Sequence, residues 1–169
     1  MYFYKKLNMK KIVVFLLFLP LLGSCQEVKT KRTQATSTTA KKIAYRVVKT
    51  DAEWQEILSP LAYRVLREAA TERAFSGPLN NNKKEGTYVC AGCKSPLYAS
   101  EHKYDSGSGW PSFYRGVDKN LEYDVDYKIC YARTELKCAV CGGHLGHMFN
   151  DGPRNTTGQR HCINSAALS

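Results

Sequence analysis

The sequence predicts a mainly β fold: a compact antiparallel β domain preceded by two helices. From Gly86 onward, short β-prone runs alternate with Gly, Pro, Asn and Asp, and no long helical period survives. Between residues 51 and 73, by contrast, apolar residues recur at helical spacing. Four cysteines form two C-x-x-C pairs, the pattern of a structural metal site. With 169 residues, the chain has room for one such domain and an N-terminal leader.

The helical part is predicted over Asp51–Arg73 in two segments. Thr50 or Asp51 can cap the first helix, because a short polar side chain there accepts from a free backbone N–H. Ser59-Pro60 ends that helix and begins the second, with the serine as N-cap and the proline at the first helical position. The apolar stripe of the second helix is interpreted as core packing. We predict β structure further on, over Thr87–Cys90, Tyr123–Arg133 and His161–Ile163.

Residues 1–25 are predicted to be a lipoprotein signal peptide, starting at Met1 or Met9. A Lys10-Lys11 pair precedes an apolar run, Ile12–Leu22, which is shorter than the roughly 20 residues that span a bilayer. Leu22-Gly23-Ser24-Cys25 follows and resembles the lipobox of bacterial lipoproteins, whose cysteine is diacylated. We expect Cys25 to anchor the chain to a membrane of the bacterial cell envelope, with the domain facing the periplasm or the exterior. The alternative is cleavage by the ordinary signal peptidase, with Cys25 incidental.

Residues 26–45 are predicted to be a flexible tether, and residues 46–169 the folded domain. The tether is rich in Thr, Ser and Lys and has too few large apolar residues to offset its ordering entropy. The formal net charge is +10, but without the first 25 residues it is +6, from 21 basic and 15 acidic residues. A charge of +6 is typical of ordinary solubility and does not by itself indicate nucleic-acid binding.

Seven cysteines divide by their spacing. Cys90-Ala91-Gly92-Cys93 and Cys138-Ala139-Val140-Cys141 can each turn two thiolates toward one ion, and together they complete a tetrahedral shell. Four soft thiolates suit Zn²⁺, and a shell without an open position indicates a structural role. The alternative is two disulfides, which an exported protein can form. A disulfide within one pair would close a very short loop and stabilise little.

Cys162 is the candidate nucleophile. It lies in Arg160-His161-Cys162-Ile163-Asn164-Ser165, downstream of a loop that is dense in Gly and His, 143–153. A thiol reacts as its thiolate, and nearby cations favour that form. Arg160, His144 and His147 are therefore candidates for the electrostatic field and for a proton donor. The alternative for Cys162 is a small buried apolar residue.

Taken together, these motifs resemble the B-type methionine sulfoxide reductases. The resemblance runs from about Trp54 to Leu168 and rests on motifs in the same order as in that family: Cys90-x-x-Cys93, Asp105-Ser106-Gly107-Ser108-Gly109-Trp110-Pro111-Ser112-Phe113, Arg133-Thr134-Glu135, Cys138-x-x-Cys141, His144–Pro153 and Arg160–Ser165. Each motif alone is weak, whereas six in order are specific.

The resemblance implies two antiparallel sheets flanked by N-terminal helices, with a structural zinc site far from the active site. It implies reduction of protein-bound methionine-R-sulfoxide, in which the Cys162 thiolate attacks the sulfoxide sulfur and becomes a sulfenic acid. His144, His147 and Asn164 would bind the oxygen and deliver protons. Trp110 would pack on the substrate methyl group, and Arg160 would help to keep Cys162 anionic. The implied partners are oxidised proteins or peptides and a thioredoxin-like reductant, and we expect a monomer.

The chain departs from the family pattern at two places. Many members carry a resolving cysteine in the Asp-Ser-Gly-Cys-Gly-Trp loop, where this chain has Ser108. Many members read Gly-Met where this chain reads Cys130-Tyr131. Cys130 is either a relocated resolving thiol or, as we favour, a core cysteine on a strand. In the second case an external thiol must reduce Cys162 directly.

Two other functions would also use some of these features. A zinc-knuckle nucleic-acid-binding module would carry basic residues beside exposed aromatic residues, but here the basic residues concentrate in the leader and the tether. We therefore expect no nucleic-acid partner. An inactive envelope interaction protein would explain Ser108. The presence of His144, His147, Cys162 and Asn164 argues against it.

Overall fold

The computed structural model describes residues 44–169. The signal peptide, the lipidation site Cys25 and the tether up to residue 43 lie outside the described residues. Within residues 44–169, no helix has the length and apolar character needed to cross a membrane.

Two short helices open the fold, α1 (Asp51–Ile57) and α2 (Pro60–Glu68). Thr50 caps α1 through a reciprocal capping box: its hydroxyl accepts from the backbone N–H of Glu53, and the Glu53 carboxylate accepts from the backbone of Thr50. Ser59 accepts a hydrogen bond from the backbone of Ala62, with Pro60 in the first turn, as predicted.

The prediction of helix as far as Arg73 is wrong. Helix α2 ends at Glu68, and Ala69 adopts the left-handed region at φ +51°. In a continued helix the Glu72 N–H would bond to the carbonyl of residue 68. It bonds instead to the side-chain oxygen of Asn164, 3.0 Å away. This contact with a distant segment replaces a helical hydrogen bond, and residues 69–86 are not helical.

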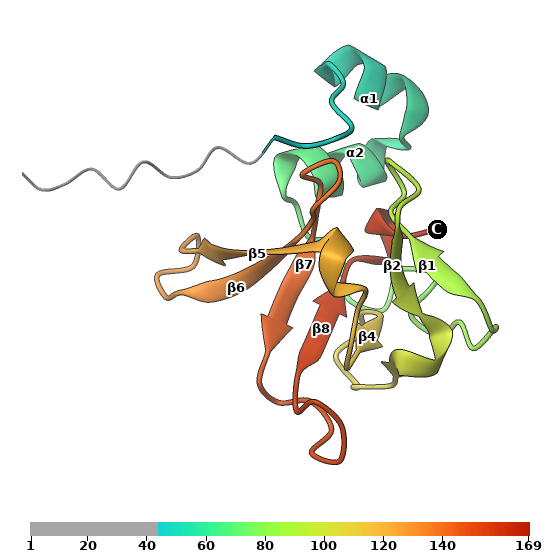
Figure 1. Cartoon of the computed structure of the whole chain (residues 1–169), viewed down its shortest axis with the longest axis vertical. Coiled ribbons are helices and arrows are strands. Elements are labelled where there is room, and N and C mark those ends of the chain that lie inside the picture. The colour runs from blue at the N-terminus through green and yellow to red at the C-terminus, as the bar shows by residue number, and fades with distance from the viewer. Residues whose placement is uncertain (1–43) are drawn as a thin grey trace, which may run out of the picture. The chain divides into compact units, whose positions relative to one another are not determined.

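The strands form two antiparallel sheets, which confirms the predicted fold class (Figure 1). The small sheet pairs β1 (Thr87–Val89) with β2 (Pro96–Ala99). The large sheet has the order β3-β4-β8-β7-β6-β5. Its strands are β3 (Lys103–Tyr104), β4 (Ser112–Phe113), β5 (Leu121–Asp126), β6 (Arg133–Cys138), β7 (His144–Phe149) and β8 (Arg160–Ile163). Residues 44–169 also contain three short 3₁₀ helices: η1 (Ser100–His102), η2 (Asp118–Asn120) and η3 (Ser165–Ala167).

The segment 123–133 is not the single strand that its composition suggests. Strand β5 ends at Asp126, a turn follows, and β6 begins at Arg133, which pairs with Asp126. Cys130 lies exposed in this turn with φ +67°, so the expectation of a core cysteine on a strand is wrong. Alternation of polar and apolar residues marks extended chain but does not show where it reverses.

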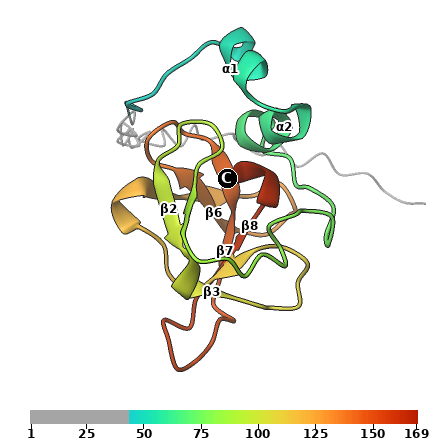
Figure 2. The ribbon, with the colours of Figure 1, turned by 90° about the vertical axis from the view of Figure 1, so that its right-hand side faces the viewer.

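The core joins the two helices to both sheets. Helix α2 contacts β7 and η3, and Figure 2 shows both helices at one end of the strands. Trp54 of α1 is 1% exposed and packs on Gly92, in the turn between β1 and β2. Leu66 of α2 packs on the same glycine and on Gly143. The helices therefore pack on the two turns that carry the C-x-x-C pairs.

Candidate active site and metal centre

The two C-x-x-C pairs meet in space. Their ligand atoms all lie within 4.8 Å of one another. Two contacts join thiols of different pairs: Cys93 and Cys138 are 3.5 Å apart, and Cys90 and Cys141 are 3.8 Å apart. A tetrahedral ion with metal–sulfur bonds of about 2.3 Å would place its sulfurs roughly 3.8 Å apart. The donor set therefore fits a four-coordinate ion, which would tie the turn between β1 and β2 to the turn between β6 and β7.

Cys162 lies on β8 at the wall of a separate cavity. Its neighbours in the ladder are Ser112 of β4 and His147 of β7. Burial raises the pKa of the Cys162 thiol, and the hydrogen bond with Ser108 and the charge of Arg160 oppose this increase. The cavity has a volume of about 120 Å³ and is lined by Thr71, Trp110, Arg133, Gly146, His147, Phe149, Cys162 and Asn164. None of the four clustered cysteines borders it.

Arg160 is held in a fixed orientation beside Cys162. Its Nε and Nη2 donate to the two carboxylate oxygens of Asp151, at 2.8 and 2.9 Å. Its guanidinium lies 4.4 Å from the centre of the Phe149 ring. The bidentate ion pair and the ring contact keep the positive charge near Cys162 and leave the guanidinium outside the cavity lining.

A β-bulge brings the two candidate histidines to the same face of β7. Residues three apart on a regular strand point to opposite faces. Here Leu136 of β6 pairs with Gly146 and Lys137 pairs with His144, so Leu145 is an extra residue in β7. The rings of His144 and His147 consequently lie 5.4 Å apart.

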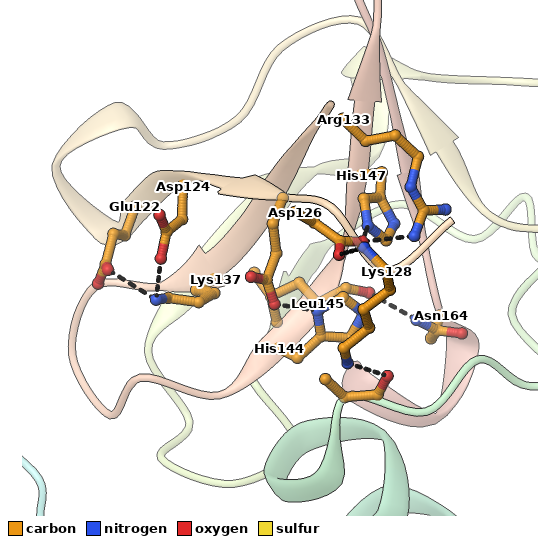
Figure 3. Close-up of polar contacts among 12 residues, drawn as sticks. Glu122, Asp124, Asp126, Lys128, Arg133, Lys137, His144, Leu145, His147 and Asn164 are labelled. Carbon is orange, nitrogen blue, oxygen red and sulfur yellow. Dashed lines mark hydrogen bonds and ion pairs between the residues drawn. The ribbon is translucent and has the colours of Figure 1, made fainter. Parts of the chain in front are cut away.

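The two histidines differ in their surroundings (Figure 3). His147 lines the cavity, and its Nε2 lies 2.8 Å from a carboxylate oxygen of Asp126, which also pairs with Arg133. Burial lowers the pKa of His147, which favours the neutral ring at neutral pH. His144 is 4% exposed, and its Nδ1 lies 2.5 Å from Glu135. The Nε2 of His144 is buried without a partner among the described residues, and the ring does not line the cavity.

Asn164 and Trp110 form two further walls of the cavity. The Asn164 amide donates to the carbonyl of Leu145 at 3.0 Å, and its oxygen accepts from the backbone of Glu72. The second N–H of this amide has no partner among the described residues. The Trp110 indole donates to the carbonyl of Glu72 at 3.2 Å. Both side chains are therefore positioned by one residue of the segment after α2.

Comparison with known proteins assigns the family. The SelR domain model matches residues 58–169. The peptide methionine sulfoxide reductase MsrB of Leptospira interrogans is 54% identical over 125 residues, which are 73% of this chain and 95% of that protein. MsrB of Bradyrhizobium diazoefficiens is 52% identical over 124 residues, 73% of this chain and 88% of the relative. The chloroplastic B1 reductase of Arabidopsis thaliana is 49% identical over 117 residues, 69% of this chain and 57% of that protein.

The chain belongs to the B-type methionine sulfoxide reductases. It is a peptide-methionine (R)-S-oxide reductase, an oxidoreductase that reduces methionine sulfoxide. The sequence resemblance to this family is thereby confirmed.

The reductase cavity depends on a residue that the sequence did not reveal. Glu72 is 4% exposed, and its carboxylate accepts from the backbones of Ser165 and Ala166, at 2.6 and 2.9 Å. Through its backbone it also holds Asn164 and Trp110. A lone acid after a helix gives no local signal of this role, because every one of these partners is distant in the sequence.

Asp126 and Arg133 were also missed as parts of the site. Asp126 accepts from His147, and Arg133 lines the cavity. The sequence places them seven residues apart, and only the turn between β5 and β6 brings them opposite each other. Arg133 was noted for its motif alone, and no spacing rule indicates Asp126.

Proposed function

We propose that Cys162 is the nucleophile that reduces protein-bound methionine-R-sulfoxide through a sulfenic acid. The thiolate attacks the sulfoxide sulfur, and the oxygen passes from the substrate to the cysteine. Methionine leaves, and Cys162 is oxidised to Cys–SOH. The observation that carries this proposal is that Cys162, Trp110, His147 and Asn164 line one cavity.

The other residues have distinct roles in this proposal. Asp126 accepts the Nε2–H of His147, which leaves Nδ1 of the neutral ring free to take the proton that Cys162 releases on ionising and to return it to the substrate oxygen. The free N–H of Asn164 binds that oxygen. Trp110 contacts the methyl group, and the charge of Arg160 stabilises the thiolate. His144 packs beside His147 and supports it.

An assay of the purified domain on R and S methionine sulfoxide with dithiothreitol tests this function. The R epimer should be reduced and the S epimer should not. Cys162→Ser should abolish turnover and leave the fold and the metal content unchanged, because a serine hydroxyl at this position has no base strong enough to replace a thiolate. Turnover of Cys162→Ser well above background would exclude Cys162 as the nucleophile.

We further propose that an external thiol or a thioredoxin-like protein reduces the sulfenic acid directly. Two thiols become a disulfide, and water carries away the oxygen. The neighbour of the Cys162 sulfur is the hydroxyl of Ser108, at 3.8 Å, whereas Cys130 lies exposed in the turn between β5 and β6. Cys130→Ser should therefore change turnover little with either reductant. Oxidation by one equivalent of substrate, followed by peptide mapping, tests this directly. A Cys130–Cys162 disulfide in high yield would make Cys130 the resolving residue.

The four clustered cysteines support a structural Zn²⁺ site, because four thiolates leave no coordination position open for substrate.

For the N-terminus, the lipobox pattern supports diacylation of Cys25 and attachment to the cell envelope, with the domain facing the periplasm or the exterior. Globomycin treatment, or Cys25→Ala, should leave unprocessed or soluble protein. Unchanged processing and unchanged membrane fractionation in both experiments would contradict lipidation.

A further inference from the structure

Three serine hydroxyls form a continuous chain that ends at Cys162. The Ser108 Oγ lies 3.8 Å from the Cys162 sulfur and 2.8 Å from the Oγ of Ser106. The Ser106 Oγ lies 2.7 Å from that of Ser112. The Ser112 hydroxyl lies 3.1 Å from the carbonyl oxygen of Trp110, to which it donates. The chain therefore joins the reactive sulfur to a backbone acceptor in the same loop.

Proton counting determines the direction of this chain while Cys162 is a thiol. Each hydroxyl has one hydrogen to donate. Because Ser112 donates to the Trp110 carbonyl, Ser106 must donate to Ser112, and Ser108 must donate to Ser106. No hydroxyl hydrogen remains for the sulfur, so the Cys162 thiol donates to Ser108.

The direction must reverse when Cys162 ionises. A thiolate carries no hydrogen and is a strong acceptor, so the Ser108 hydroxyl turns toward it. Ser106 then donates to Ser108, and Ser112 donates to Ser106. This leaves the Trp110 carbonyl without the Ser112 hydrogen. Ser112 is 0% exposed, so its hydroxyl has no solvent partner and is shared only among its neighbours in the chain. Ionisation of Cys162 therefore replaces the weak S–H···O bond with a charge-assisted bond from Ser108 and loses the neutral bond between Ser112 and the Trp110 carbonyl.

We propose that Ser108 is a further catalytic residue, which donates a hydrogen bond to the Cys162 thiolate, and that Ser112 is a positioning residue, which restrains this donation by holding the chain in the opposite direction. The proposal rests on the proposed function, in which Cys162 reacts as a thiolate. It predicts opposite effects for two similar serine-to-alanine changes. Ser108→Ala removes the donor to the anion, whereas Ser112→Ala removes the bond that reversal must break.

The experiment measures the acidity of Cys162 in the full chain without any substrate. The rate of alkylation by iodoacetamide is followed against pH, and the Cys162 peptide is quantified by mass spectrometry. Ser108→Ala should raise the pKa of Cys162 by about one pH unit, which is roughly a tenfold loss of acidity. Ser112→Ala should lower the pKa of Cys162 by about 0.5 to 1 pH unit, as expected for one neutral hydrogen bond. Ser108→Thr keeps the hydroxyl and should stay close to the wild type.

The two loop variants decide the proposal even if Ser112→Ala does not fold. An unchanged or lower pKa of Cys162 in Ser108→Ala would overturn it, and so would equal increases in Ser108→Ala and Ser108→Thr. An increase in the pKa of Cys162 in a folded Ser112→Ala would also overturn it, because the proposal requires a decrease there. Alkylation needs no turnover, so these results remain distinct from a failure of Cys162 as the nucleophile, which the Cys162→Ser assay detects.

Discussion

At the scale of the residue, the Asp126 carboxylate both contacts two cavity residues, His147 and Arg133, and contributes to the stability of the fold. A backbone hydrogen bond from Lys128, with contributions from His147 and Arg133, holds the pKa of Asp126 well below its usual range. Its charge therefore stabilises the fold above about pH 4, the usual unfolded value, and this contribution is lost as the pH falls through the lower folded value.

We predict that Asp126→Asn lowers the free energy of unfolding at neutral pH by about 1–3 kcal/mol, because the charged Arg133 loses its anionic partner. It should also lower kcat, since His147 loses the anion that orients it. In urea denaturation, the difference from the wild type should narrow from about pH 5 to about pH 2. Asp124→Asn on the same strand, whose side chain is 52% exposed, is the matched control and should change both quantities little. A difference that widens on acidification would contradict the prediction.

At the scale of the element, the segment between α2 and β1 holds two walls of the cavity in position. Its Glu72 caps the start of η3 with a carboxylate and fixes Asn164 and Trp110 with its backbone. Gly77 packs against the same place, where an added Cβ would lie 2.3 Å from that of Ser165. The geometry of two cavity walls therefore depends on how this one segment packs.

We predict that Glu72→Ala lowers kcat/KM by between about 10- and 100-fold, since small displacements of positioned groups have effects of this size. It should also destabilise the fold by about 1–3 kcal/mol, because the buried N–H of Ser165 and the partly buried N–H of Ala166 lose their acceptor. Glu72→Gln keeps one good acceptor and should lose less of both. The exposed Glu68→Ala, at the end of α2, is the control for losing an acid nearby. If Glu72→Ala and Glu68→Ala had the same kcat/KM, Glu72 would not position the cavity residues.

At the scale of the whole molecule, the four-cysteine cluster connects the two sheets. One pair lies in the turn of the small sheet and the other in the turn between β6 and β7, and both turns pack under the helices. Metal binding at such a place is coupled to folding, because the unfolded chain does not bring the two pairs together.

We predict about one zinc per chain by elemental analysis. Cys93→Ser should lose the metal and either lower the melting temperature sharply or prevent folding. Cys130→Ser removes an exposed thiol outside the cluster, so it should retain the metal and the melting temperature. A chain free of metal, with four half-cystines in mass spectrometry, would indicate the disulfide alternative instead.

The features that depend on local chemistry were predictable from the sequence. The caps Thr50 and Ser59 act within one turn of their partners, and the two residues between paired cysteines set how both thiols can face one ion. Cys162, Trp110, His147 and Asn164 were found by motif, and the structure brings them to one cavity. His144 was grouped with them, but it lies beside the cavity lining.

Only the tertiary structure decided which groups hold these residues in place. Glu72 meets Asn164 and Ser165 more than ninety positions along the chain, and the bulge at Leu145 exists only in relation to the register of β6. The exposed turn at Cys130 and the reach of Ser108 to Cys162 likewise depend on the packing of strands. By itself the sequence predicted Cys162 as the candidate nucleophile, the four cysteines that cluster in space and the helix caps, because short-range spacing and local motifs specify them. The supporting hydrogen bonds join distant segments, so they exist only once the chain has folded.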